Sequence, residues 1–144
     1  MRNRLEKINF LLSFLIENVE KSKIIVFFNT CASVDFYTKL ISDFLTKENE
    51  EIINRIYGMH GKLKNKKRNK ILNSFTEKDS GCLFATDVVS RGIDFDHIHY
   101  IIQVDPPEDP DNYIHRIGRT ARVNNSGTAI LLIENHEDSF IQYL

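Results

Sequence analysis

The hydrophobic residues at the start of the chain recur at the spacing of an amphipathic helix. The positions on the apolar side are Leu5, Ile8, Leu12, Leu15, Ile16 and Val19. The intervening positions, which include Glu6, Lys7 and Glu17, are polar or charged and are expected to face water. The pattern predicts a helix over about residues 4–20, with one side packed on a core.

Short, nearly continuous apolar runs follow, and they alternate with further helical patterns. The runs cover residues 24–28, 52–57, 82–86, 100–104 and 128–133. Unbroken runs of this length are typical of strands that are buried on both faces of a parallel sheet. Four further helices are expected. One begins with Ser33 as its N-cap, a second covers residues 64–76, a third follows the loop that contains Pro110, and a fourth covers residues 136–144. This alternation predicts one α/β domain over residues 1–144, with a mainly parallel central sheet flanked by helices.

The composition is that of an ordinary globular protein, which excludes disordered and fibrous classes. Of the 144 residues, 42% are hydrophobic and 27% are charged, and the net charge is -1. Cys31 and Cys82 stand next to apolar residues and lack metal-ligand spacing, so we expect buried thiols in a reducing compartment and neither a disulfide nor a metal site. No apolar run is long enough to cross a bilayer and no signal-peptide pattern opens the chain, so we expect an intracellular protein without membrane contact.

Two basic clusters stand out against this nearly neutral balance. The first is a run of lysines and one arginine at residues 62–70, and such a run is more often a solvated face than a nucleic-acid site. In the second, Arg116, Arg119 and Arg122 stand three apart, so a helix would turn them to one side. Planar guanidinium groups match phosphate oxygens, which suggests a polyanion opposite them, and a solvated face is again the alternative.

The chain lacks one motif that a nucleotide-binding domain would need. No Gly-x-x-x-x-Gly-Lys-Ser/Thr loop, which cradles nucleotide phosphates, occurs in the sequence. An anion-facing helix without a phosphate loop of its own indicates that the chain supplies half of a two-domain site.

Two longer motifs resemble a known family. Residues 85–94 are similar to motif V of DEAD-box RNA helicases, and residues 113–122 are similar to motif VI. Further landmarks occur in family order, namely motif IV at 25–30, a histidine-glycine pair at 60–61 with Asn65 and Arg68, and the strand before motif VI at 103–106. Together these landmarks span roughly residues 20–134, so the resemblance covers most of the chain.

This resemblance implies a RecA-like three-layer domain that is the second domain of an ATP-dependent RNA helicase. The domain would close over RNA and over ATP with Mg²⁺, which an N-terminal domain absent from this chain would hold. Closure would drive local unwinding of RNA duplexes or remodelling of RNA–protein complexes. This chain alone would be an inactive monomer. The alternatives are a non-catalytic RNA-binding or scaffold module with the same fold, and a general protein-interaction domain.

The resemblance also implies roles for individual residues around ATP. Arg119 and Arg122 would be arginine fingers that reach the γ-phosphate, and His115 would couple hydrolysis to closure. The ATP-binding positions would be Arg91, Gly92 and Asp94. The structural positions within motif VI would be Arg116, paired with a carboxylate of motif V, and Gly118.

The RNA-binding positions would contact sugar and phosphate groups, so binding would be independent of base sequence. They are Thr30, Gly61, Asn65, Arg68, Thr86 and Asp87. Asn65 stands where the family usually has Gln, Ser90 where Ala is frequent, and Ala121 where Gly is commoner. Residues 27–34 most resemble the subgroup that acts in assembly of the large ribosomal subunit, which implies ribosome biogenesis in the nucleus or nucleolus.

Overall fold

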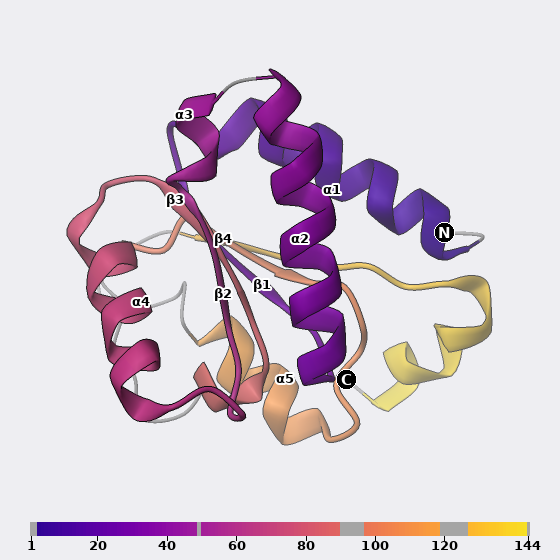
Figure 1. Cartoon of the computed structure of the whole chain (residues 1–144). Coiled ribbons are helices and arrows are strands. Elements are labelled where there is room, and N and C mark those ends of the chain that lie inside the picture. Colours follow the sequence, from indigo (N-terminus) through magenta and orange to yellow (C-terminus); the bar gives the residue numbers. More distant parts are fainter. Residues whose placement is uncertain (1–2, 49, 90–96, 119–126, 144) are drawn as a thin grey trace.

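The central element of the computed structural model is a parallel sheet, and the structure describes residues 3–48, 50–89, 97–118 and 127–143. In this part of the chain the sheet has five strands in the order β2-β3-β1-β4-β5, and every neighbouring pair is parallel. The strands are β1 (Lys23–Phe27), β2 (Ile56–Met59), β3 (Gly81–Ala85), β4 (Tyr100–Gln103) and β5 (Thr128–Leu131). Because all of them run the same way, their carboxyl ends lie together along one end of the sheet (Figure 1).

Helices cover both faces of this sheet. Figure 1 shows α1 (Arg4–Asn18) and α2 (Cys31–Glu48) on one side and α4 (Asn65–Glu77) on the other. The remaining elements are α3 (Glu50–Ile53), α5 (Pro110–Ile117) and two 3₁₀ segments, η1 (Asp87–Val89) and η2 (Asn135–Tyr143). The arrangement confirms the predicted three-layer α/β domain, and the predicted N-terminal helix forms as α1.

Side chains of the buried strands pack into two hydrophobic cores, one between the sheet and each helical layer. Ile24 and Val26 of β1 join a cluster with residues of α1 and α2, whereas Ile25 and Phe27 join a second cluster with Phe75 of α4. All five residues of β1 are buried, because alternate side chains enter opposite cores. This two-sided burial is the reason that the strands are continuous apolar runs.

Polar side chains define where three of the helices begin. The side chain of Asn3 accepts a hydrogen bond from the backbone N–H of Glu6 at the start of α1 (3.1 Å). Asp109 caps α5, and Pro110 occupies its first turn. Pro110, which was expected in a loop, therefore begins a helix, because a first-turn residue needs no backbone N–H for the helical ladder.

The predicted N-cap of the second helix is wrong by three residues. α2 already begins at Cys31, and the hydroxyl oxygen of Thr30 accepts the backbone N–H of Ser33 (3.1 Å). Both residues have a suitable side chain, but an N-cap side chain bonds the N–H two or three positions later, and only Thr30 has that geometry.

Two other segments also differ from the sequence prediction. The expected strand at 52–57 is wrong in its first half, because Glu50–Ile53 forms the short helix α3 and β2 begins only at Ile56. Ile52 is nevertheless buried in the core on the α2 side, so its apolar character was required by burial and not by a strand. The closing segment is helical but consists of 3₁₀ turns. Among the described helices, none is long and apolar enough to cross a membrane.

Candidate functional site

Arg116 occupies the centre of the carboxyl end of the sheet. Its side chain is fully buried, and its Nε and Nη2 atoms donate to the two carboxylate oxygens of Asp87 at 2.5 and 2.9 Å. A planar guanidinium fork matches both oxygens of a carboxylate in this way. The Asp87 side chain keeps 31% exposure, so one member of the pair still contacts solvent.

Three further acceptors satisfy the remaining donors of Arg116. Nη2 also donates to Oδ1 of Asn29 (2.9 Å), and Nη1 donates to Oε1 of Gln103 (3.3 Å) and to the backbone carbonyl of Asp105 (3.1 Å). The guanidinium carbon lies 5.3 Å from the centre of the Phe27 ring. Partners at the ends of β1, β3 and β4 are thus held by one side chain of α5. We call Arg116 with Asp87, Asn29, Gln103 and Asp105 the arginine hub.

The arginine hub lies next to residues 113–118, the part of motif VI that the structure describes. α5 ends at Ile117, and the backbone N–H of Gly118 still bonds the carbonyl of Ile114 at 3.0 Å. His115 is exposed, next to the buried Arg116. A Cβ on Gly118 would lie 3.3 Å from the Ile114 carbonyl oxygen, so this position is tightly packed.

Five of the predicted site residues lie outside the described residues. They are Arg91, Gly92, Asp94, Arg119 and Arg122. Within the described part of the chain, α5 carries Arg116 alone of the three arginines whose spacing suggested a common face, and that side chain points into the protein.

The predicted RNA-binding residues lie after three neighbouring strands. Thr30 follows β1, Gly61 follows β2 and Thr86 follows β3, and the strand order β2-β3-β1 brings these three loops next to one another. Thr30 and Gly61 are exposed, and a Cβ on Gly61 would meet no atom within 4 Å. The loop at Gly61 thus presents its backbone to open space.

The other predicted RNA-binding residues differ in exposure. Asn65 is exposed at the first position of α4, and Arg68 is half-buried one turn later. Thr86 is almost fully buried, and the carboxylate of Asp87 is engaged by Arg116.

His60 supports the loop that contains Gly61, a role that the sequence did not reveal. Its Nδ1 accepts the backbone N–H of Lys62 (3.2 Å), so the proton of a neutral ring is on Nε2, which lies 3.0 Å from Oδ1 of Asp35 on α2. The ring is nearly buried. His60 therefore fixes the loop after β2 against α2.

Lys7 forms a second buried charge centre at the same end of the sheet. Its ammonium group donates to the carbonyl of Val104 (2.6 Å) and to Oε2 of Glu137 (3.1 Å). Carboxylate oxygens of Asp105 and Glu134 lie 3.9 and 3.8 Å away. Asp105 thus joins the two centres, since its carboxylate faces Lys7 while its carbonyl accepts a hydrogen bond from Arg116.

The expectation that Lys7 faces water is wrong, because its side chain is fully buried. The sequence did contain a signal for this, since Lys7, Leu11 and Leu15 stand four apart and form the buried stripe of α1. A lysine in an apolar stripe indicates a buried ammonium group with carboxylate or carbonyl partners.

The two cysteines are free thiols, and the prediction that both are buried is correct for Cys82 and wrong for Cys31. Cys82 is buried in the core, and this burial raises the pKa of its thiol, whereas Cys31 is partly exposed at the start of α2. Within the described ranges, no group of three or more His, Cys, Asp or Glu side chains is placed to hold a metal ion.

Comparisons with known proteins place this geometry in a family. Residues 6–124 match the family described as the helicase conserved C-terminal domain. The chain is 36% identical over 139 residues to the probable ATP-dependent RNA helicase ddx55 of Dictyostelium discoideum, covering 96% of this chain and 20% of that protein. It is 42% identical over 139 residues to DEAD-box ATP-dependent RNA helicase 49 of Arabidopsis thaliana, covering 96% of this chain and 24% of that protein.

Solved structures agree with these relatives. Domain 2 of the DEAD-box helicase Mss116p, bound to an RNA duplex, superposes with a TM-score of 0.82 at 32% identity, covering 98% of this chain and 55% of that chain. Mss116 bound to single-stranded RNA and UDP-BeF gives a TM-score of 0.81 at 31% identity, covering 99% of this chain and 28% of that one.

The chain therefore belongs to the helicase conserved C-terminal domain family, as the C-terminal domain of a DEAD-box RNA helicase. The RecA-like fold implied by the sequence motifs is confirmed. The chain spans about a fifth to a quarter of the length of these curated relatives.

Proposed function

We propose that residues 1–144 act as one unit, the second RecA-like domain of an ATP-dependent RNA helicase that closes over ATP and RNA together with an N-terminal domain. The observation that carries this proposal is the arginine hub. Arg116 ties the loops after β1, β3 and β4 to the helix that leads into Arg119 and Arg122. A shift of any of these loops would therefore be transmitted to motif VI.

On the ATP side, Arg119 and Arg122 reach the γ-phosphate of a nucleotide that the other domain holds with Mg²⁺. A guanidinium group supplied across a domain boundary stabilises the charge that develops in phosphoryl transfer, and it contributes about a thousandfold or more to turnover. This is about 4 kcal/mol of transition-state stabilisation. His115, exposed beside the hub, contacts the N-terminal domain and couples hydrolysis to closure. Arg91, Gly92 and Asp94 bind ATP.

On the RNA side, the loops after β2, β3 and β1 contact the sugar and phosphate backbone through the six positions named above. The RNA-bound structures that this chain resembles support the assignment. Backbone contacts carry no sequence information and release counterions, so binding is independent of sequence and weakens with salt. Because Arg116 engages the Asp87 carboxylate, Asp87 also holds the hub next to Thr86.

We also propose a cellular role for the protein. The protein acts as an intracellular monomer in assembly of the large ribosomal subunit, in the nucleus or nucleolus. The role in ribosome assembly and the nuclear location rest on the resemblance of residues 27–34 to the helicases that act in assembly of the large ribosomal subunit.

The test is ATP turnover, with and without RNA, by the longer protein that carries an upstream ATP-binding domain. Arg122→Ala should abolish RNA-stimulated hydrolysis, because the γ-phosphate loses a guanidinium group, while RNA affinity changes far less. Lys47→Ala, which removes a positive charge from the exposed end of α2, is the matched control and should leave both unchanged. Equal loss of hydrolysis and RNA binding would show that Arg122 serves RNA or folding instead.

A further inference from the structure

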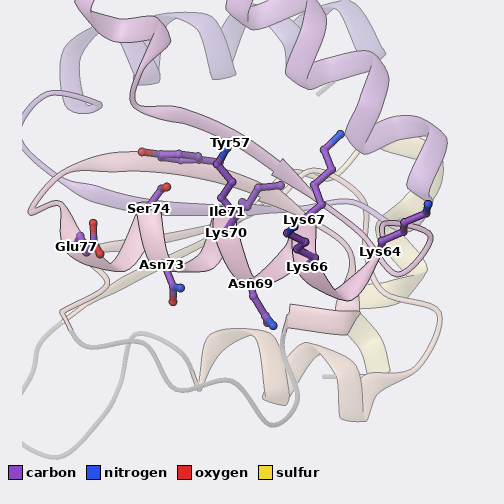
Figure 2. Close-up of a pocket in the computed structure, with 10 residues that line it drawn as sticks. All are labelled: Tyr57, Lys64, Lys66, Lys67, Asn69, Lys70, Ile71, Asn73, Ser74 and Glu77. Carbon is purple, nitrogen blue, oxygen red and sulfur yellow. The ribbon is translucent and has the colours of Figure 1, made fainter.

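The outer side of α4 carries a basic surface beyond the positions assigned to RNA. We define the α4 basic surface as Lys64, Lys66, Lys67 and Lys70. These lysines line one end of a shallow hollow, which is completed by Tyr57 of the edge strand β2 and by Ser74 further along α4. Figure 2 shows the lysines on the first half of the helix and Glu77 at its far end.

Among the described residues, no carboxylate pairs with the charges of this surface. Residues 61–76 contain six lysines and arginines and no Asp or Glu. In the described part of the chain, none of the four lysines forms an ion pair with a carboxylate. Cations close together on one helix repel each other, so an anion at this surface would relieve the repulsion.

The position of the lysines along α4 is also electrostatically unfavourable. Lys64, Lys66 and Lys67 stand at the N-cap and in the first turn of the helix, where the helix dipole disfavours positive charge. Lys64 is the N-cap residue and makes no capping hydrogen bond with its side chain, and the first turn has no acidic residue. By contrast, α1 and α5 both begin with a side-chain cap and an acidic residue. The residues at the start of α4 therefore do not stabilise the helix, whereas a bound anion would stabilise it.

The occupant that fits this surface is the RNA backbone. The same helix begins with Asn65 and carries Arg68 one turn later, so the α4 basic surface adjoins the RNA positions after β2. Asn69 and the Ser74 hydroxyl interleave neutral hydrogen-bonding groups with the cations, which suits phosphate and sugar oxygens. An RNA strand that passes the loop of Gly61 meets cations and neutral hydrogen-bonding side chains again when it continues along α4.

We propose that the α4 basic surface is an auxiliary contact for the phosphodiester backbone of RNA, and that it extends the RNA path outward from the loops at the carboxyl ends of the strands. This inference rests on the proposed function, because it presumes that RNA occupies those loops. It adds residues, Lys67 and Lys70 above all, to which the family resemblance assigns no role. The extension favours long strands over short ones.

The experiment measures binding of this 144-residue chain to fluorescein-labelled oligouridine of six and of twenty nucleotides, by anisotropy at several salt concentrations. Lys67→Gln with Lys70→Gln should weaken binding of the long strand about tenfold at low salt. The variant should also lower the slope of log affinity against log salt by about 1.4, because each lost phosphate contact lowers it by about 0.7. Binding of the short strand should stay unchanged, since the loops alone accommodate it.

Two controls separate this inference from its premise. Lys39→Gln with Lys47→Gln removes the same charge from the exposed side of α2 and should change neither binding constant. Arg68→Gln should weaken binding of both strands. If the Lys67 and Lys70 variant binds the long strand like the unmodified chain while Arg68→Gln weakens it, the inference is overturned and the proposed function stands.

Other outcomes also decide the matter. If the α2 control loses as much affinity for the long strand as the Lys67 and Lys70 variant does, the effect is general charge attraction and the inference is overturned. A labelled oligoglutamate of twenty residues that binds the unmodified chain as tightly as the RNA does, and loses affinity in the same variant, would assign the surface to an acidic protein segment instead. If the unmodified chain binds neither RNA, the same comparison is made in the longer protein that carries an upstream ATP-binding domain, and absence of RNA binding there overturns both the proposed function and the inference.

Discussion

Replacement of Arg116 by Met would remove the buried guanidinium group while keeping an unbranched side chain of similar length. The two carboxylate oxygens of Asp87, the amide oxygens of Asn29 and Gln103, and the carbonyl of Asp105 would all lose their donor. The arginine hub would then no longer connect α5 with the ends of β1, β3 and β4.

The cost can be bounded from the exposure of each acceptor. Breaking a buried ion pair by removing one partner costs about 3–5 kcal/mol. Water can reach Asp87, which is partly exposed, so the loss should lie at the low end of that range. Gln103, in contrast, is fully buried, and its amide nitrogen has no partner in the described structure, so Arg116→Met would leave both ends of this amide unpaired. We expect a loss of about 3 kcal/mol in the free energy of unfolding.

Urea unfolding followed by circular dichroism measures this loss, since the chain contains no tryptophan to report by fluorescence. The melting temperature should fall by roughly 6–12 °C, at about 2–4 °C per kcal/mol for a chain near this size. Arg116→Lys should be intermediate, because an ammonium group keeps the charge but cannot bond Asp87, Asn29 and Gln103 from one planar fork. Arg68→Met on α4 is the control and should change stability by less than about 0.5 kcal/mol. A loss below about 1 kcal/mol for Arg116→Met would refute the assignment of the hub as the element that ties these loops together.

Three further predictions concern other parts of the molecule. Lys7→Met should cost about 3 kcal/mol in urea unfolding, because three carboxylates then face one another without their ammonium group; a neutral result would mean that water compensates for the loss. Gly61→Ala should leave the melting temperature unchanged and weaken RNA binding. Gly58→Ala should lower the melting temperature, because its Cβ would lie 2.5 Å from the Thr38 hydroxyl oxygen; equal effects would contradict the packing of β2 on α2. Iodoacetamide at pH 8 should label Cys31 in the folded chain and Cys82 only after unfolding. Because burial raises the pKa of the Cys82 thiol, its contribution to stability is full below about pH 8.5 and declines above it, by at most about 1.4 kcal/mol per pH unit; early labelling of Cys82 would contradict its burial.

The sequence predicted the layers of this fold because burial on both faces leaves a continuous apolar run. β1, β3 and β4 were found within one residue of their ends for that reason. The start of β2 was missed because Ile52 and Ile56 are both apolar, and a run this short does not distinguish a helical turn from a strand. Hydrophobic pattern determines what is buried, whereas backbone hydrogen bonding determines the element.

Prediction of the site was less complete, because hydrogen-bond partners are distant in sequence. Motif resemblance suggested that Arg116 pairs with a carboxylate of motif V, but nothing in the local pattern indicated Asn29, which is 87 positions away. Lys7 was misplaced because a charged residue is normally assigned to the water side of a helix, and its partner Glu137 is 130 positions away. Buried charges are located by the whole fold, and a short stretch of sequence contains at most a hint of them.

The most direct test of the central claim is ATP turnover by this chain in isolation, compared with the longer protein that includes an upstream ATP-binding domain, each with saturating RNA. The account predicts turnover at background for the isolated chain, because it supplies arginines but no phosphate-binding loop, and RNA-stimulated turnover for the longer protein. Hydrolysis of ATP above background by the pure 144-residue chain would contradict the claim that it is half of an active site.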